Sequence, residues 1–383
     1  MHIAWLGKKS PFCGNVTYGR EVTNALLDRG YQVSFLHFAQ EEGDTSSYFG
    51  SQEVSLPCLY KSQIYTIPTL GASKVLSQSL KQLKPDIVHA SLTLSPLDFL
   101  LPEICEELNI PLIATFHPPF DGKRRNLKSG TQLFTYQVYA PFLANYDRVI
   151  VFSKLQRDFL VRLGVPTEKL AVIPNGVDEQ KYSPATTSRL KSQFNAQRLF
   201  VYQGRIAPEK NVESLLRAWK QSNMGENSKL LIVGNGSLLS NLMPFYGAEY
   251  GIIWLGFIAN EQQRIEILRG ADVFILPSLL EGLSLSLLEA MSCGIACMAT
   301  DAGADGEVLE DGAGVILSTH RVSTQLRTLL PILRDHQDWT TLLGQKARER
   351  ILERYTLRNN ITQLEALYEE VLQGRRVHLS SRV

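Results

Sequence analysis

The chain lacks the cysteine pattern of a disulfide framework or a structural zinc site. It has five cysteines, an odd number, and none of them forms a Cys-x2-Cys motif or stands beside a pair of histidines. A pairing framework or a zinc site needs such spacing. We therefore expect reduced thiols in a cytoplasmic protein, and we assign no metal ligands.

The chain also lacks an apolar run of about eighteen residues, the length that a membrane-spanning helix needs. Its first residues, MHIAWLGKK, place the lysines after a short apolar stretch, which is the reverse of a secretory signal. A large net charge is missing as well, because 39 basic and 38 acidic residues leave a net charge of +1. This balance argues against a nucleic-acid partner, so we expect a local patch to meet any anionic partner.

What the sequence does contain is an alternation of short apolar strands and helical segments, in a composition that is 44% hydrophobic and 20% charged. This alternation is typical of a parallel sheet wrapped by helices. We predict an α/β fold of two Rossmann-like, doubly wound parallel-sheet domains that face each other across a cleft. Strands are expected near 2–7, 31–38, 86–90, 111–115, 147–152 and 170–174, and again near 198–205, 230–233, 252–254, 272–277, 296–299 and 314–317.

A polar stretch after Pro184, ATTSRLKSQFNAQ, separates the two series of strands. We therefore place an N-terminal domain at 1–184 and a C-terminal domain at 198–355. A long helical segment is expected over 337–373, and the C-terminal part, 356–383, could cross back to the first domain. Because ligands in such folds sit beyond the carboxyl ends of the strands, we expect a site shared by the two domains.

Two glutamates, Glu281 and Glu289, carry the strongest functional signal, in the segment PSLLEGLSLSLLEAM. Glu281 lies on a strand-to-helix turn, and Glu289 lies about 9 Å further along the helix. This separation suits two parts of one extended ligand: Glu289 can accept the two hydroxyls of a ribose, and Glu281 can accept hydroxyls of a transferred sugar. The alternative is a solvated helix face, which the almost uncharged surroundings disfavour.

The turn after Glu281 also suits a phosphate. Gly282 lets the backbone approach a ligand closely. The amides of Leu283, Ser284 and Leu285 open the helix, and a helix N-terminus favours an anion. The sequence therefore predicts a phosphate-binding site at the start of this helix.

The segment YQGRIAPEK supplies two cations at the carboxyl end of another strand. Gly204 permits the turn, and Arg205 and Lys210 combine a planar guanidinium with a mobile ammonium, which suits a diphosphate. The alternative is a surface loop with two ordinary basic residues. Because this segment and Glu281 belong to the same domain, we favour a shared site.

Weaker signals come from four further positions. Gly234, in VGNGS, lies in another strand-glycine-helix turn, and Ile258, in WLGFIAN, would offer its backbone to a base edge. In the first domain, Gly14 comes just before a helix. His117 follows a strand and could donate a hydrogen bond to the donor sugar, or it could be a satisfied structural histidine.

Four motifs resemble those of the retaining GT-B glycosyltransferases of family 4: GR…EK at 204–210, IPNGVD at 173–178, VGNGS at 233–237 and Glu-x7-Glu at 281–289. The resemblance implies a nucleotide-diphosphate sugar donor, transfer without a metal or cofactor, and an α-linked product. It also implies that Arg205 and Lys210 bind the diphosphate, that Glu289 binds the ribose and that Glu281 binds the sugar. Gly14 and His117 would lie near the phosphate and the sugar.

Two positions depart from the pattern of that family. Cys13 stands where a glycine often precedes Gly14, which puts the phosphate contacts of the first domain in doubt. Ser284 stands where many members carry glycine, and we expect its amide to stay free for a phosphate.

The acceptor is expected on the first domain. Lys123, Arg124, Arg125 and Lys128 form a basic cluster, which Tyr136, Tyr139 and Phe142 follow in a helical stretch. A basic and aromatic surface of this kind can rest on an anionic membrane. A solvated loop is the alternative.

The segments GKKSPFCGNVTYGREVTNALLDRG and TFHPPFDGKRRNLKSG are similar to those of cyanobacterial digalactosyldiacylglycerol synthases. This similarity implies UDP-galactose as the donor and monogalactosyldiacylglycerol as the acceptor. The residues leave three alternatives open: a transferase with a polysaccharide or soluble acceptor, a nucleotide-sugar epimerase, and a non-catalytic sugar-nucleotide sensor.

Overall fold

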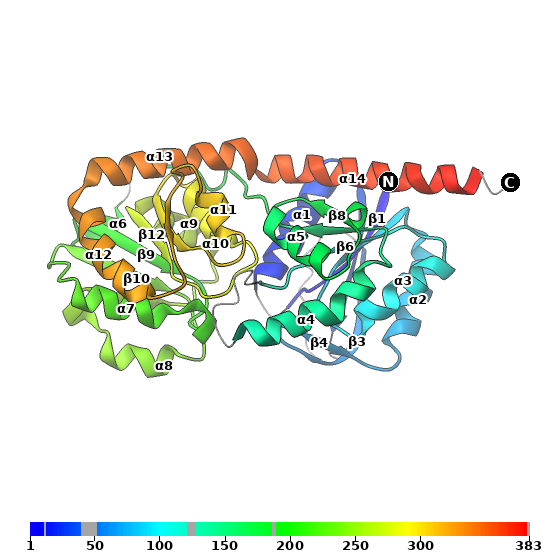
Figure 1. The fold of residues 1–383 in the computed structure, drawn as a ribbon, viewed down its shortest axis with the longest axis horizontal. Coiled ribbons are helices and arrows are strands. Elements are labelled where there is room, and N and C mark those ends of the chain that lie inside the picture. The colour runs from blue at the N-terminus through cyan, green and yellow to red at the C-terminus, as the bar shows by residue number, and fades with distance from the viewer. Residues whose placement is uncertain (11–12, 40–51, 121–127, 186–188, 381–383) are drawn as a thin grey trace. The chain divides into compact units, whose positions relative to one another are not determined.

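The computed structural model describes residues 1–10, 13–39, 52–120, 128–185 and 189–380, without the side chains of 128–131 and 376–380. The chain divides into two compact units (Figure 1). The N-terminal unit comprises Met1–Pro118, Thr131–Asn175 and Leu357–Val383. The C-terminal unit comprises Pro119–Gly130 and Gly176–Thr356.

The N-terminal unit is built on a sheet with the strand order β4-β3-β2-β1-β5-β6-β7-β8. All neighbouring strands are parallel except β3 and β4, which pair antiparallel. The winding of the sheet reverses between β1 and β5, which makes this the switch point of the unit. The strands are β1 (His2–Gly7), β2 (Gln32–Ala39), β3 (Gln52–Lys61), β4 (Thr66–Pro68), β5 (Ile87–Ser91), β6 (Leu112–Thr115), β7 (Arg148–Val151) and β8 (Leu170–Val172).

Helices cover both faces of this sheet (Figure 1). The first helix begins at Gly14 and is closed by Gly30, whose φ of +85° provides the left-handed conformation that the sequence predicts there. The helices are α1 (Gly14–Asp28), α2 (Ala72–Leu83), α3 (Leu97–Glu107), α4 (Lys128–Leu143), α5 (Lys154–Arg162) and α14 (Leu357–Ser380), with a short 3-10 turn, η1 (Thr167–Lys169).

The C-terminal unit repeats this plan with the strand order β11-β10-β9-β12-β13-β14, so its switch point lies between β9 and β12. Both of these central strands are buried along their whole length, as continuous apolar runs predict for a parallel sheet covered on both faces. The strands are β9 (Arg198–Gln203), β10 (Ser228–Val233), β11 (Ile252–Gly256), β12 (Val273–Leu276), β13 (Ala296–Thr300) and β14 (Val315–Leu317).

The helices of the C-terminal unit present apolar stripes to its sheet. In α7 the buried residues Val212, Leu215, Leu216 and Trp219 recur at helical spacing. The longer helices are α7 (Val212–Gln221), α9 (Glu261–Gly270), α10 (Leu285–Ser292), α12 (Val322–Asp335) and α13 (Gln337–Arg354). The shorter ones are α6 (Leu190–Gln193), η2 (Pro208–Lys210), α8 (Leu239–Leu242), η3 (Met243–Phe245), η4 (Ala248–Tyr250) and α11 (Asp305–Leu309).

All the strands expected from the sequence are present, with ends that shift by one or two residues. The hairpin of β3 and β4 was not among the expected strands. Pro57 stands inside β3, where proline is unusual. In the structure Pro57 still accepts a hydrogen bond through its carbonyl, from Thr69 at 3.1 Å. The proline is tolerated next to the short edge strand β4.

The predicted domain boundaries need two corrections. Residues 176–184 belong to the C-terminal unit and not to the N-terminal one, because Val177 pairs with Thr356 in an isolated bridge. The expected helix over 337–373 is two helices, α13 and α14, which break at Tyr355 and Thr356. The division between the units falls at this break.

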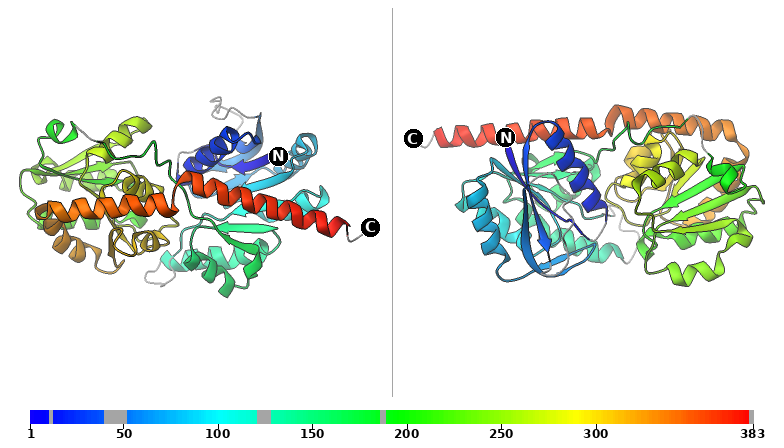
Figure 2. Two further views of the ribbon diagram at one scale, coloured as in Figure 1. Left: turned by 90° about the horizontal axis from the view of Figure 1, so that it is seen from above. Right: turned by 180° about the vertical axis from the view of Figure 1, so that it is seen from behind.

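The C-terminal helix α14 packs against α1 of the N-terminal unit (Figure 2). Its buried Tyr368 places the hydroxyl 2.5 Å from Nδ1 of His89, whose Nε2 lies 2.7 Å from the hydroxyl of Thr115. Burial lowers the pKa of His89 to about 3, so its ring is neutral at physiological pH. An ion pair between Arg375 and Asp147, at 2.9 Å, holds the helix near its far end.

Candidate functional site

The switch point of the C-terminal unit brings together the loops that follow β9 and β12. The amide of Leu279 donates to the carbonyl of Glu209 at 2.8 Å, and the side-chain amide of Asn211 donates to the carbonyl of Pro277 at 3.1 Å. Asn211 therefore ties the two loops together and does not cap α7 with its side chain. The two strongest motifs of the sequence share one edge of the sheet.

Lys210 and Glu281 form the central contact of this site. The ammonium of Lys210 donates to Oε1 of Glu281 at 2.6 Å, and both side chains are largely buried. An ammonium has three donors and a carboxylate has several lone pairs, so this contact leaves each group able to bind a ligand. The pair thus places a phosphate-binding cation directly beside a hydroxyl-binding anion.

The loop between β13 and α11 braces the turn that carries Glu281. Gly303 has a φ of +60°, and a Cβ atom there would lie 2.1 Å from the carbonyl oxygen of Glu281. The amide of Ala304 donates to the carbonyl of Gly282 at 2.8 Å. On the other side, the amide of Phe120 donates to the carbonyl of Glu281 at 3.1 Å. The backbone of the turn is therefore fixed from both sides.

Asp305 is a functional candidate that sequence reasoning missed. Its carboxylate is fully buried, its Oδ1 accepts from the amide of Ser284 at 2.9 Å, and its Oδ2 has no partner among the described residues. Burial, together with the negative charge of Glu281, raises the pKa of Asp305 well above its ordinary value. No motif could have revealed this residue, because its partner lies 21 positions earlier in the chain.

The contact from Asp305 corrects the prediction for Ser284. Its amide is not free for a phosphate, because it donates to Asp305. The hydroxyl of Ser284 instead accepts from the amide of Leu287, so Ser284 is the cap of α10. The helix still begins at Leu285, in the buried turn after Glu281, Gly282 and Leu283.

Glu289 lies inside α10 and is buried. Its Oε2 accepts from the side-chain amide of Gln203 at 3.0 Å, at the end of β9. The negative charge of Glu289 contributes, after burial, to raising the pKa of the Tyr182 hydroxyl. A carboxylate held beside amide and phenol groups is suited to accept further hydroxyl donors.

Arg205 follows β9 and has a more exposed side chain than Lys210. Its guanidinium forms an ion pair with Glu209 at 2.9 Å, one helical turn along the chain. Gly204 lies between the end of β9 and Arg205, and its amide donates to the carbonyl of Val233 at 3.0 Å. The structure thus places Arg205 on the loop after β9, next to the η2 turn that carries Lys210.

Gly234 serves the packing of two loops. Its φ is +139°, and a Cβ atom there would lie 1.9 Å from the carbonyl oxygen of Gly204. Ile258, the other weak candidate, is buried, and its carbonyl accepts from the guanidinium of Arg264 at 2.9 Å. Both positions have a structural contact that accounts for them in the unbound protein.

The switch point of the N-terminal unit holds a neutral hydrogen-bonded network. The hydroxyl of Ser91, at the end of β5, donates to Oδ1 of Asn15 at 2.7 Å and lies 2.8 Å from Nε2 of His117. Burial and the nearby cation of Lys8 lower the pKa of His117 to about 3. The histidine is therefore neutral at physiological pH. Because Ser91 gives its one hydrogen to Asn15, its oxygen can accept from Nε2 of His117.

The remaining first-domain predictions fare differently. Gly14 begins α1 and is exposed, and a Cβ atom there would meet open space. Lys123, Arg124 and Arg125 lie outside the described residues, as does the side chain of Lys128.

The aromatic surface expected on α4 is only partly present. Tyr136 and Tyr139 are core residues, because the inner face of α4 turns them toward Gln156 and Asp98, which bond their hydroxyls at 2.9 Å each. Phe142 is exposed.

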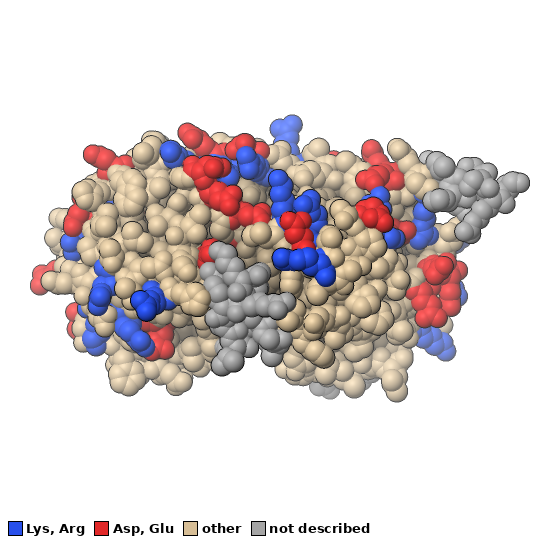
Figure 3. Space-filling model, viewed as in Figure 1, with Lys and Arg blue, Asp and Glu red and all other residues tan. Residues whose placement is uncertain are grey.

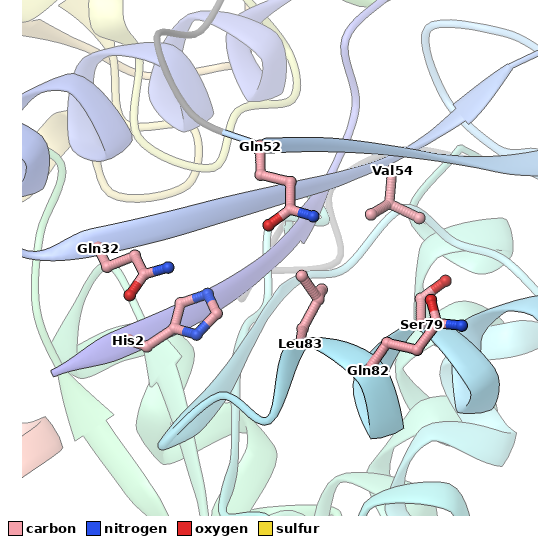
Figure 4. A pocket seen from close by; sticks show the side chains of 7 residues that line it. All are labelled: His2, Gln32, Gln52, Val54, Ser79, Gln82 and Leu83. Carbon is pink, nitrogen blue, oxygen red and sulfur yellow. The ribbon is translucent and has the colours of Figure 1, made fainter.

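A hollow in the N-terminal unit lies at the amino ends of the strands (Figure 4). The switch-point loops that carry Asn15, Ser91 and His117 lie at the carboxyl ends. The hollow is formed by the first residues of β1, β2 and β3 together with the end of α2. Its lining residues are His2, Gln32, Gln52, Val54, Ser79, Gln82 and Leu83. Because ligands of doubly wound sheets bind at the carboxyl ends of the strands, we do not assign the donor to this hollow.

Within the described ranges, no three or more His, Cys, Asp and Glu side chains gather in a group that could hold a metal ion. The five cysteines are free thiols. Among the helices that the structure describes, none has the length and apolar character needed to cross a membrane.

Comparison with protein families matches both halves of the chain. Residues 14–181 match the model described as Glycosyltransferase Family 4, and residues 186–351 match the model described as Glycosyl transferases group 1. The chain belongs to the GT-B glycosyltransferases of this type. Both the Lys210–Glu281 pair and Glu289 lie within the group 1 match, and Ser91 and His117 lie within the family 4 match.

Two curated proteins similar to this glycosyltransferase span most of its length. The UDP-Gal:alpha-D-GlcNAc-diphosphoundecaprenol alpha-1,3-galactosyltransferase of Escherichia coli is 27% identical over 313 residues, or 78% of each chain. The N-acetyl-alpha-D-glucosaminyl L-malate synthase of Bacillus anthracis is 22% identical over 370 residues, or 94% of each chain.

A solved structure supports the fold of the glycosyltransferase. Anabaena HepE in complex with UDP-glucose superposes with a TM-score of 0.76, at 17% identity, over 97% of this chain and 100% of that one.

Proposed function

We propose that this glycosyltransferase transfers galactose from UDP-galactose to monogalactosyldiacylglycerol, with retention of the anomeric configuration and without a metal ion. The observation that carries the proposal is the 2.6 Å contact between Lys210 and Glu281 at the switch point of the C-terminal unit. In a nucleotide sugar the hexose is bonded directly to a phosphate, so a site for both needs an anion-binding and a hydroxyl-binding group side by side. This pair supplies both.

The donor extends from this pair along the switch point. Lys210 and Arg205 bind the diphosphate, Glu281 accepts hydroxyls of the hexose, and Glu289 accepts the ribose diol. Gln203 orients Glu289 through its 3.0 Å hydrogen bond. Gly204, Gly234 and Ile258 shape the surrounding loops, and Gly282, Leu283 and Leu285 present backbone near the phosphate.

The chemical step breaks the bond between the anomeric carbon and the diphosphate oxygen, and a bond forms between that carbon and the acceptor oxygen. Negative charge grows on the departing diphosphate, and Lys210 and Arg205 are in place to stabilise it. The acceptor hydroxyl gives up its proton as the new bond forms, and the oxygen of the departing diphosphate takes up that proton. The role proposed for neutral His117 is to hydrogen-bond the sugar, and the role proposed for Gly14 is to contact the phosphate.

The choice of donor and acceptor is supported by the similar Escherichia coli enzyme, whose name specifies UDP-galactose and a lipid-linked acceptor. The bound UDP-glucose of the Anabaena protein agrees with a uridine nucleotide. An acceptor in a membrane would bring the enzyme to a lipid surface.

Product formation from radiolabelled UDP-galactose and detergent-dispersed monogalactosyldiacylglycerol tests the proposal. We expect a digalactosyl lipid whose new linkage is α by nuclear magnetic resonance, formed at an equal rate in the presence of a chelator. UDP-glucose and soluble galactosides serve as matched alternatives. Transfer to a soluble acceptor alone, or a β-linked product, would contradict the proposal.

A further inference from the structure

An exposed apolar hairpin stands at the edge of the N-terminal sheet. It consists of residues 59–70, from the end of β3 through β4 to the start of α2, and is called the edge hairpin below. Its exposed large apolar side chains are Leu59, Tyr60, Ile64, Tyr65, Ile67 and Leu70. Soluble proteins rarely expose so many large apolar side chains in one short segment.

The edge hairpin is held in a defined conformation. The hydroxyl of Ser62 accepts from the amides of Ile64 and Tyr65, at 3.2 Å and 3.1 Å. The buried ammonium of Lys8 donates to the carbonyls of Ser62 and Gln63, at 3.1 Å and 3.2 Å. The apolar side chains are therefore displayed by an ordered turn.

Charge in and after the edge hairpin has a single sign. Residues 54–85 contain four lysines, Lys61, Lys74, Lys81 and Lys84, and no aspartate or glutamate. The last three are exposed on or just after α2. This bias differs from the chain as a whole, in which acidic and basic residues are nearly equal in number.

The surface over α4 is almost free of charged side chains in Figure 3. On α4, Phe134 and Phe142 are exposed, and no charged residue occurs between Lys128 and Asp147. An uncharged surface with tyrosines and flanking lysines matches the interface of an anionic bilayer, where aromatic rings sit at the level of the headgroups.

We infer that the edge hairpin inserts its apolar side chains into the interface of an anionic lipid bilayer while the lysines of α2 contact the headgroups. This inference rests on the proposed function for its lipid acceptor, but binding to a bilayer needs neither donor nor acceptor. The turn also contacts Lys8, which follows β1 at the switch point of the N-terminal unit. Docking of the hairpin thus positions that switch point beside the membrane surface.

Vesicle flotation with the full-length protein tests the inference. Wild-type protein is expected to float with vesicles of equimolar phosphatidylglycerol and phosphatidylcholine, and to float less at high salt. The double variant Ile64→Ser with Leu70→Ser should lower the partition coefficient by more than about tenfold. Ile64 is 59% exposed and Leu70 is fully exposed, so neither change opens the core.

Two further variants separate the hairpin from general surface effects. Met243→Ser with Phe245→Ser removes apolar side chains of similar exposure, 51% and 67%, from the C-terminal unit and should float like wild type. Lys74→Gln with Lys81→Gln should weaken flotation on the anionic vesicles and leave the melting temperature unchanged. This lysine variant decides the question if the hairpin variant melts early.

Transfer to detergent-dispersed acceptor should be equal in wild type and in the hairpin variant. Failure of that transfer in wild type would remove the proposed function and leave the flotation result standing. Wild type that does not float, or a hairpin variant that floats like wild type, would overturn the inference. So would a dimer in sedimentation that only the hairpin variant disrupts, because the surface would then bind a second copy of the chain.

Discussion

In the C-terminal unit the switch point brings opposite charges into direct contact, whereas in the N-terminal unit an amide, a hydroxyl and a neutral imidazole form the hydrogen-bonded network. Lys210, Glu281 and Glu289 stand at the first. Asn15, Ser91 and His117 stand at the second. A cation near the second, Lys8, donates to the carbonyls of Ser62 and Gln63 instead. Two sheets with the same winding thus hold opposite kinds of chemistry at equivalent places.

Under the proposed function, the two kinds of group suit two different parts of a nucleotide sugar. Charged groups bind and stabilise a diphosphate, on which negative charge develops. Neutral polar groups bind hydroxyls without competing for that charge. The low pKa of His117 fits this difference, because it keeps the imidazole neutral at physiological pH.

Removing the charge of Lys210 should lower the catalytic efficiency more than any other change proposed here. We expect Lys210→Ala to raise the activation barrier by about 3 kcal/mol, or about 100-fold in kcat/KM, because the leaving diphosphate loses its nearest cation. Steady-state kinetics on a variant with an unchanged melting temperature measure this. Lys346→Ala, at an exposed lysine of the same unit, is the control and should keep wild-type activity. A normal rate in Lys210→Ala would remove Lys210 from the site.

A side chain at position 303 should displace the charged site without removing any charge. Gly303→Ala places a Cβ atom against the carbonyl oxygen of Glu281 and forces an unfavourable φ. We expect a loss of about 1–3 kcal/mol in the free energy of unfolding and a raised KM for the donor. Denaturant unfolding and donor titration measure the two effects.

Gly374→Ala, where a Cβ atom meets nothing within 4 Å, is the matched control for Gly303. It should be neutral or stabilising. Equal stability in both variants would show that the loop between β13 and α11 does not brace Glu281.

Asp305 should make the stability of the folded chain depend on pH. Its pKa is raised in the folded state, so between about pH 4 and that raised value the folded chain holds a proton that the unfolded chain has lost. The contribution of Asp305 to the free energy of unfolding therefore falls as pH rises through this range. Asp305→Asn keeps an acceptor for Ser284 and has no such slope.

The melting temperature of Asp305→Asn relative to wild type should therefore increase from about pH 5 to about pH 8. Thermal unfolding by circular dichroism at both values measures this difference. A constant difference would mean that Asp305 is ionised in the folded protein.

Changes in the network of Asn15, Ser91 and His117 should have the smallest effect on activity. Ser91→Ala removes the hydroxyl between Asn15 and His117 and should lower the free energy of unfolding by about 1 kcal/mol, with less than about tenfold loss of kcat/KM. Ser91→Thr keeps a hydroxyl and serves as the control. A loss of kcat/KM as large as that of Lys210→Ala would mean that the N-terminal unit contributes as much to catalysis as the C-terminal unit does.

Much of the fold could be predicted from the sequence, because parallel strands buried on both faces are continuous apolar runs with turns after them. β9 and β12 are examples, and the motifs that follow them meet as the strand order requires. β3 was missed because it contains Pro57 and exposed apolar residues. Those same exposed residues make the edge hairpin a candidate for lipid contact.

The candidate site was predictable where one strand end sufficed to place a residue, as for Glu281 and Lys210. It was not predictable where a contact joined distant loops. Asp305 occupies the amide of Ser284, and Gly303 abuts Glu281, and neither contact leaves a local pattern. Tyr136 was misassigned to the surface because its burial depends on which side of α4 faces the sheet.

Because α14 returns to the N-terminal unit, that unit is the last of the two to be completed during synthesis. The ribosome makes the first strands of that unit at the start and its last helix at the end, so the C-terminal unit emerges complete while its neighbour is still unfinished. Until Tyr368 has been made, His89 lacks the hydroxyl that covers it. A chain that ends before Leu357 would carry Lys210 and Glu281 in a finished unit and would leave His89 without the hydroxyl of Tyr368.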